Sequence, residues 1–178
     1  MNDRPIPESY WVVPGAFLAG GYPISSTNDT VARQTLAGFL EVGIGTFFDL
    51  TQASELAPYL PYLQTESARY GISPNYQRFN IQDRGLPSHD QMALLLDAID
   101  STLAAGGKLY LHCWGGIGRT GTAVGCWLVR HGLGGEQALL KLGELYRTSL
   151  QSNFSPQSPE TDAQMQFILA WKEGDGLA

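Results

Sequence analysis

Apolar residues fall into short runs bounded by glycine and proline, and these runs alternate with longer stretches of helical spacing. The short runs predict strands, because apolar and β-branched residues between turn residues suit a strand buried in a sheet. The predicted strands are Trp11–Val13, Phe17–Ala19, Ile44–Leu50, Tyr76–Ile81 and Lys108–His112.

The longer stretches between and after the strands predict helices. Ser88 and Gln91 have the Ser-x-x-Gln form of a capping box, which begins a helix that ends before Gly106. Strands separated by helices along most of the chain predict an α/β fold, with a sheet that helices cover on both faces. The predicted helices are Asn28–Val42, Ala53–Tyr70, Ser88–Ala104, Arg119–His131, Gly135–Thr148 and Glu160–Trp171, with a loop over Ser152–Pro159.

Length and composition are those of an ordinary soluble globular chain. The sequence has 178 residues, of which 43% are hydrophobic and 16% charged, unlike disordered, fibrous or membrane proteins. A chain of this length can bury a full core, so we expect one compact domain over residues 1–178. No apolar stretch approaches the length that spans a bilayer, and we expect no membrane partner.

The chain is acidic, with a formal net charge of -6 at pH 7. Surfaces that bind nucleic acid need clustered Lys and Arg, so we expect no nucleic-acid partner. The overall field also repels phosphate. Any anion site therefore has to be built locally, from backbone N–H groups and a few well-placed cations.

The first residues and the cysteines bear on the compartment. Residues 1–8 lack the apolar core of a secretory signal. Two cysteines, Cys113 and Cys126, make no disulfide scaffold, and reducing conditions would keep a catalytic thiol free. We therefore expect a cytoplasmic setting. Cys126 lies inside an apolar helical pattern and is expected to be a core residue.

One glycine-rich segment carries the candidate chemistry. Residues 112–121 read His-Cys-Trp-Gly-Gly-Ile-Gly-Arg-Thr-Gly between a predicted strand and a predicted helix, which is where α/β sheets usually bind ligands. The glycines allow positive φ, so the loop's N–H groups can curl toward one centre, and the helix N-terminus adds its positive dipole end. We expect a phosphate-binding loop of Trp114, Gly115, Gly116, Ile117, Gly118 and Arg119.

Two side chains of this segment predict phosphoryl transfer. Thiols at helix N-termini and beside cations ionise more readily than free cysteine, so Cys113 is expected to be a thiolate that attacks phosphorus. Arg119 has a planar fork of N–H donors that matches the equatorial phosphoryl oxygens, where charge gathers in the transition state. If Cys113 were only a buried hydrophobe, its spacing to Arg119 and Thr120 would be a coincidence.

Two neighbours are expected to support these groups. The Thr120 hydroxyl could donate a hydrogen bond to the Cys113 sulfur and ease its departure when the thiophosphate is hydrolysed. His112, at the end of a predicted strand, could hydrogen-bond the loop backbone and hold its shape.

The leaving alkoxide or phenolate needs a proton, which an Asp or Glu usually supplies. We predict Asp83 as this general acid, because it follows a predicted strand in a segment with Gly85 and Pro87 that could form a movable loop. Asp90 is the alternative, although its place in the first turn of a capped helix already explains it. Asp49, at another strand end, is expected to be structural or at the pocket rim.

We expect no metal and no cofactor. The chain has neither a His/Cys cluster nor carboxylates with ligand-like spacing, which agrees with covalent hydrolysis. The deprotonated Asp83 could accept a proton from the water that attacks phosphocysteine. His89 and His131 lie near helix ends and are expected on the surface.

The segment 112–121 resembles the signature loop of the protein tyrosine phosphatase superfamily, and Asp83 falls where the dual-specificity branch carries its acid. Within that branch, the loop and residues 83–87 are most similar to kinase-associated phosphatases and bacterial relatives. The resemblance implies a mixed, mostly parallel sheet. It also implies that Gln164 matches the glutamine that positions the hydrolytic water, with Gln166 as the fallback; the alternative is that Gln164 is an exposed helix residue.

Differences from relatives bear on the substrate. The Lys-Asn-Arg-Tyr loop that deepens the pocket of large tyrosine-specific phosphatases is absent, which implies a shallower cleft. Trp114 and Ile117 stand where phosphoinositide phosphatases have lysines. We expect a phosphorylated protein as substrate and partner, through phosphotyrosine and also phosphoserine or phosphothreonine. A phosphatase of inositol phosphates, phosphoinositides or RNA 5′ ends, and a phosphoprotein-binding module without turnover, are the alternatives. The oligomeric state stays open.

Overall fold

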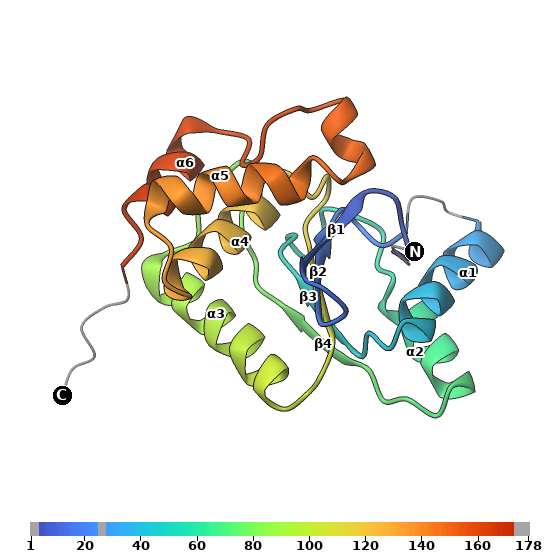
Figure 1. The fold of residues 1–178 in the computed structure, drawn as a ribbon. Helices are drawn as coiled ribbons and strands as arrows, with labels where there is room; N and C mark the ends of the chain where they lie inside the picture. The colour runs from blue at the N-terminus through green and yellow to red at the C-terminus, as the bar shows by residue number, and fades with distance from the viewer. Residues whose placement is uncertain (1–3, 25–27, 173–178) are drawn as a thin grey trace.

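A five-stranded sheet forms the centre of the computed structural model, which describes residues 4–24 and 28–172 (Figure 1). The strand order is β1-β2-β5-β3-β4. β1 pairs with β2 antiparallel, and the other three neighbouring pairs are parallel, so the predicted mixed, mostly parallel α/β fold is confirmed. The strands are β1 (Ser9–Val13), β2 (Phe17–Gly20), β3 (Thr46–Asp49), β4 (Asn75–Arg78) and β5 (Leu109–His112).

Helices cover both faces of the sheet, with α1 and α2 on one side and α3 to α6 on the other (Figure 1). Among the described residues, none of these helices has the length and hydrophobicity to cross a bilayer. The helices are α1 (Asp29–Glu41), α2 (Leu60–Arg69), α3 (His89–Ala104), α4 (Gly118–Arg130), α5 (Gly135–Tyr146) and α6 (Asp162–Leu169), with a 3-10 helix over Leu150–Asn153.

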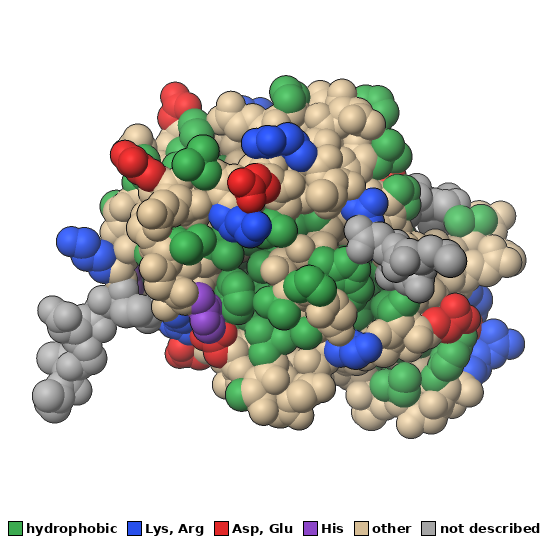
Figure 2. All heavy atoms as spheres, in the orientation of Figure 1, with side chains coloured by type: hydrophobic (Ala, Val, Ile, Leu, Met, Phe, Trp, Pro, Cys, Tyr) green, Lys and Arg blue, Asp and Glu red, His purple; other side chains and the backbone are tan. Residues whose placement is uncertain are grey.

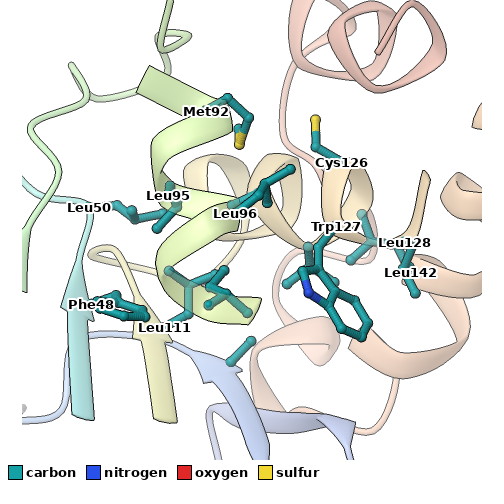
Figure 3. Close-up of a cluster of buried hydrophobic side chains, with 14 of the residues drawn as sticks. Phe48, Leu50, Met92, Leu95, Leu96, Leu111, Cys126, Trp127, Leu128 and Leu142 are labelled. Carbon is teal, nitrogen blue, oxygen red and sulfur yellow. The ribbon is translucent and has the colours of Figure 1, made fainter. Parts of the chain in front are cut away.

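Each face of the sheet has its own hydrophobic core, and β5 contributes to both. Leu109 and Leu111 belong to the cluster under α3 to α6, whereas Tyr110 belongs to the cluster under α1 and α2. This alternation explains why β5 is apolar from Leu109 to Leu111: successive side chains point to opposite, equally buried faces. Cys126 lies inside the larger cluster (Figure 3), so the prediction that it is a core residue is confirmed.

The predicted helix Ala53–Tyr70 is wrong over its first seven residues. The chain has turns and loop there, and α2 begins only at Leu60. Pro58 has no backbone N–H to contribute to a helix, and Pro61 fits only in the first helical turn, where no N–H partner is needed. Between β3 and Pro58, the Glu55 carboxylate accepts the backbone N–H of Gln52 and closes a turn instead.

Other element ends differ by a few residues. The Ser88 capping box is present, with both of its hydrogen bonds to Gln91. β4 ends at Arg78 instead of Ile81, and the last helix is shorter than predicted because Thr161 caps it at Asp162. The predicted domain covers residues 1–178, of which 1–3, 25–27 and 173–178 lie outside the part that the structure describes.

Candidate active site

The glycine-rich loop lies at one edge of the sheet, where the parallel strands β2, β5 and β3 all end. Gly20, His112 and Asp49 are aligned partners at the ends of these strands. Cys113 follows β5 directly, and α4 begins at Gly118. The loop therefore has the position expected for an anion site, between a strand end and a helix N-terminus.

Glycine is required at one loop position for two independent reasons. Gly116 has a φ of +72°, and a Cβ there would lie 2.3 Å from the backbone carbon of Gly20. The loop thus packs directly on the end of β2. Tyr22, just past β2, donates its backbone N–H to the carbonyl of Trp114 at 2.7 Å and fastens the loop from the same side.

Arg119 is held in a network of four hydrogen bonds. Nη1 donates to Glu55 Oε2 at 2.7 Å and to the Ile81 carbonyl at 3.0 Å. Nη2 donates to Glu55 Oε1 at 2.6 Å and to Asp83 Oδ1 at 2.9 Å. Burial alone would lower the pKa of Arg119, but the hydrogen bonds to Glu55 and the nearby Cys113 and Asp83 outweigh burial and raise it. The guanidinium is therefore a fixed cation next to the loop.

Glu55 is a site residue that the sequence analysis missed. Its carboxylate forms a bidentate pair with Arg119, and the hydrogen bonds from Arg119 hold the pKa of Glu55 below its ordinary value. Glu55 falls inside the predicted helix Ala53–Tyr70, where an acidic residue carries no signal of a site. Pro58 and Pro61 were the signal that a loop with a free carboxylate could lie here.

Asp83, and not Asp90, lies beside Arg119. Asp83 is in a turn closed by a hydrogen bond from the Gly85 N–H to the Gln82 carbonyl, and its side chain is 53% exposed. Asp90 is exposed in the first turn of α3. A carboxyl group that is near the loop and also open to solvent has the position that a proton donor to a leaving group needs.

His112 has the hydrogen bond to the loop that we expected of it. Its Nδ1 lies 3.2 Å from the Cys113 carbonyl, and its Nε2 lies 2.8 Å from the Tyr59 hydroxyl. A carbonyl can only accept, so Nδ1 carries the proton. Burial lowers the pKa of His112, which makes it a neutral ring that accepts from Tyr59. Tyr59, just before α2, is a second residue that the sequence analysis missed.

Asp49 is a fully buried structural anchor next to His112. It accepts hydrogen bonds from Thr51, Tyr76 and Arg78, and Oδ1 is 4.0 Å from His112 Nδ1. Burial raises the pKa of Asp49, but His112, Thr51 and Arg78 outweigh burial and bring it below its ordinary value. Of the two expectations for this residue, the structural one fits.

The expected hydrogen bond from Thr120 to the Cys113 sulfur is wrong. The Thr120 hydroxyl donates instead to the Gly20 carbonyl at 3.3 Å. Thr120 is the third residue of α4, and its side chain faces the end of β2 from there. Since a hydroxyl has one proton, it ties α4 to the sheet and leaves the sulfur without this donor.

Gln164 is buried, whereas Gln166 is exposed. The Gln164 side chain accepts the N–H groups of Glu160 and Thr161, and its amide donates to the Gly85 carbonyl at 3.2 Å. The expectation of an exposed helix residue is therefore wrong for Gln164, and the fallback, Gln166, is the exposed one. Gln164 connects the start of α6 with the segment that carries Asp83.

The remaining predicted residues divide between buried and exposed positions. Cys113 is 3% exposed and free, and Trp114 beside it is 56% exposed. His89 and His131 are exposed at helix ends, as expected. Over residues 4–24 and 28–172, no group of three or more His, Cys, Asp or Glu is arranged to hold a metal ion.

A cavity of about 660 Å³ opens beside the loop. Most of its wall comes from segments that precede β1 or follow β2, β3 and β5, which meet at the same edge of the sheet, and Thr35 of α1 and Gln151 of the 3-10 helix complete it. The wall combines apolar side chains with polar surface, and Glu8 is the one charged residue among the described residues that line it. Representative lining residues are Pro7, Glu8, Tyr22, Ile24, Leu56 and Trp114.

Comparison with known proteins bears on the reaction. The family model Tc-R-P, described as "Polymorphic toxin system, DSP-PTPase phosphatase", matches residues 24–133. This range includes Glu55, Asp83 and the loop from Cys113 to Arg119. Over 124 residues, the chain is 32% identical to "Putative tyrosine phosphatase 067L" of Invertebrate iridescent virus 3. That match covers 67% of this chain and 45% of the viral protein, so the chain matches less than half of its relative's length.

Solved structures share the fold. Kinase associated phosphatase (KAP), with serine in place of its catalytic cysteine, has a TM-score of 0.68 at 19% identity, over 93% of this chain and 96% of that one. The core catalytic domain of the PP-IP phosphatase SIW14 from S. cerevisiae has a TM-score of 0.64 at 18% identity, over 97% and 90%. At these identities, the likeness shows the fold alone.

Proposed function

The chain belongs to the family of DSP-PTPase phosphatases that Tc-R-P describes, and on that premise we propose that it hydrolyses phosphotyrosine, and also phosphoserine and phosphothreonine, in proteins. Phosphatase chemistry follows from the family. The protein substrate, and the part that each residue takes in the reaction, are the proposal.

The observation that carries the proposal is the convergence of three groups at one strand end. Cys113 begins the loop, Arg119 closes it, and Asp83 lies 2.9 Å from the Arg119 guanidinium. A thiolate at Cys113 attacks the phosphorus, the loop N–H groups and Arg119 hold the equatorial oxygens, and Asp83 protonates the leaving oxygen. Water then hydrolyses the phosphocysteine, with Asp83 accepting its proton.

Substrate binding has to rearrange the Arg119 network. All four hydrogen-bond contacts of the two Nη atoms go to protein oxygens, so a phosphate that takes two donors has to displace one of them. Asp83 is the most exposed partner and the one on the movable turn. Once displaced, its carboxyl lies next to a phosphate dianion, which favours the protonated form that a general acid needs. Glu55 stays and keeps the guanidinium oriented.

The cavity beside the loop supports a polypeptide substrate. Its wall of proline, tyrosine, leucine and tryptophan with the single carboxylate of Glu8 suits apolar or basic side chains that flank a phosphorylated residue. A highly phosphorylated inositol would need Lys or Arg at these positions, because each added phosphate requires a compensating cation.

A cytoplasmic setting is part of the proposal. The mechanism needs Cys113 as a reduced thiol, and reducing compartments keep thiols in that form. Cys113 is a free thiol, as the mechanism requires.

The test is turnover without added metal, on an aryl phosphate, a matched set of phosphopeptides and an inositol polyphosphate. We expect activity with the first two and at least about tenfold lower kcat/KM for the third. Cys113→Ser should reduce turnover by several orders of magnitude, since its hydroxyl does not ionise, and Cys126→Ser is the matched control. Equal rates for Cys113→Ser and wild type would disprove the mechanism. A higher kcat/KM for the inositol phosphate than for the phosphopeptides would disprove the protein substrate and leave the mechanism standing.

A further inference from the structure

A groove lies on the outer side of α5, apart from the residues assigned to catalysis. It has a volume of about 700 Å³ and runs between α5, α6 and residues 156–158. In Figure 1, α5 lies across the outer side of α4. In the same orientation, acidic, basic and hydrophobic side chains lie next to one another over this part of the molecule (Figure 2).

Four residues along the groove form one stripe on α5. They are Glu136, Leu140, Gly143 and Arg147, all of which line the groove. Their spacing of four, three and four residues keeps them on a single face of the helix. This face points away from the core, which α5 contacts through Ala138, Leu142 and Tyr146.

The side chains of the stripe are exposed and can contact a partner. Leu140 is 69% exposed, and it lines the groove together with Met165 and Leu169 of α6. Glu136 and Arg147 are both exposed, and neither has an ion-pair partner within the residues that the structure describes. The Arg147 guanidinium lies over the stripe, with Nη2 3.7 Å from the point where a Cβ on Gly143 would be.

We propose that this stripe is the contact surface of a symmetric dimer, in which α5 packs antiparallel against α5 of a second copy of the chain. The charges of the stripe read the same in an antiparallel partner: Glu136 at one end faces the partner's Arg147, and Arg147 faces the partner's Glu136. Along the helix, Glu136 and Arg147 are centred on the same point as Leu140 and Gly143. One two-fold axis therefore satisfies all four residues.

The steric pattern matches the same symmetry. Leu140 lies opposite the partner's Gly143, which has no side chain. The leucine can enter the groove there once the Arg147 guanidinium, 3.7 Å from that position, turns toward the partner's Glu136. The reciprocal contact repeats on the other side of the axis. The spacing of four, three and four is that of the contact positions of packed antiparallel helices, where each large side chain enters a hole on the facing helix.

Charge decides between the possible orientations. A parallel arrangement would place Glu136 next to the partner's Glu136 and Arg147 next to the partner's Arg147, and like charges face to face are unfavourable. The antiparallel one pairs opposite charges at both ends. Met165 and Leu169 of α6 line the same groove and add apolar area beside the helix pair, which a charged stripe alone would lack.

The experiment is sedimentation velocity of the full chain from about 1 to 200 µM, a range that covers associations of modest affinity. We expect the wild type to shift with concentration from the 19.4 kDa chain toward a dimer. Glu136→Arg and Arg147→Glu should each weaken the dimer by about tenfold or more, because like charges then face each other. The double variant restores opposite charges and should bring the dissociation constant back to within about threefold of wild type.

The control is the double exchange Lys141→Glu with Glu144→Lys, which reverses an ion pair of 3.1 Å on α5 but off the stripe. It should dimerise like the wild type. Circular dichroism and aryl phosphate turnover show whether each variant is folded. If a charge-reversed single variant does not fold, Glu136→Gln takes its place. A wild type that stays monomeric throughout would overturn the proposal. So would a Glu136→Arg dimer of unchanged affinity, or a double variant no tighter than the singles.

Discussion

At the scale of single residues, the site depends on the hydrogen-bond partners that Arg119 has before substrate binds. Its two Nη atoms donate to Glu55, Ile81 and Asp83. A buried guanidinium without such partners would cost several kcal/mol, so the protein stabilises the cation before it is used. Glu55, which is 13% exposed, does so from a more buried position than Asp83, which is 53% exposed.

Replacing Glu55 by Gln tests its role as the residue that positions Arg119. The Gln amide is uncharged and has one oxygen, so both contacts to Arg119 weaken and only one can remain an N–H···O hydrogen bond. The value of kcat/KM should therefore fall by about tenfold or more. The pKa of Glu55 is lowered by Arg119, so its stabilising contribution is present above the ordinary pKa of Glu and is lost as pH falls through the lowered value. Urea unfolding of Glu55→Gln should therefore depend less on pH in that acidic range.

The control for this prediction is Glu144→Gln, which changes an exposed carboxylate on α5. It should leave both the steady-state rate and the pH dependence of unfolding as they are. If Glu55→Gln keeps the wild-type kcat/KM, then the backbone and Asp83 are sufficient to orient Arg119.

The pH profile of the rate separates Asp83 from Asp90. We expect a bell-shaped profile whose falling limb reports the group that protonates the leaving oxygen. Asp83→Asn should abolish the falling limb and lower kcat, because the amide cannot protonate the leaving group. Asp90→Asn is the matched control in the next segment of chain. An Asp83→Asn enzyme with its falling limb intact would mean that another group is the acid.

At the scale of elements, close packing of α4 against α6 and residues 158–159 positions the loop. Gly121 and Gly125 lie one turn apart on α4: a Cβ on the first would lie 2.1 Å from Ser158 Oγ and on the second 2.3 Å from a carbon of Ile168. Ser158 in turn donates to the Ile117 carbonyl of the loop at 2.7 Å. The glycines of α4 thus bring the start of α6, with Gln164, close to the active site.

Gly125→Ala tests this packing. The added methyl group overlaps Ile168 in a filled core, which should lower the free energy of unfolding by about 1–3 kcal/mol. Gly38→Ala is the matched control, because its Cβ would meet nothing closer than 3.7 Å, and a helical alanine should raise stability by about 0.5–1 kcal/mol. Urea unfolding of both variants measures the difference. A stabilised Gly125→Ala protein would show that α6 can shift without cost.

At the scale of the whole molecule, the net charge opposes the reaction that we propose for the site. The chain has a net charge of -6, which repels a phosphate dianion at long range, whereas Arg119 and the loop attract it at short range. Salt screens exposed, distant charges more than buried, close ones. The two contributions therefore differ in their response to ionic strength.

We expect kcat/KM for an aryl phosphate to rise by about twofold as salt increases from about 10 to 150 mM, because screening removes the long-range repulsion. The value of kcat should stay nearly constant, since the bound state is held by short contacts. Steady-state kinetics at fixed pH measure both. A kcat/KM that falls with salt would mean that local positive potential outweighs the net charge during the approach of substrate.

The sequence by itself determined the α/β fold and the place of the loop, and it also led to the nucleophile and the phosphate clamp that we propose, Cys113 and Arg119. These are local: strand, glycine turn and helix follow one another along the chain, and Cys113 and Arg119 are separated by one loop. Asp83 could also be proposed from the sequence, because the reaction requires a proton donor and the segment around Asp83 has the residues of a turn. The resemblance to the dual-specificity branch is confirmed by the family comparison.

Only the tertiary structure decided which distant residues meet the loop. Glu55 and Tyr59 come from a segment mistaken for helix, and Gly20 rather than Cys113 receives the Thr120 hydroxyl. Gln164 is buried and donates to the Gly85 carbonyl, so it is not the exposed helix residue of the alternative. The physical reason is common to all of them. Periodicity and spacing report interactions within an element, whereas parallel strands bring residues many positions apart to one edge of the sheet, where side-chain partners are set by packing in three dimensions.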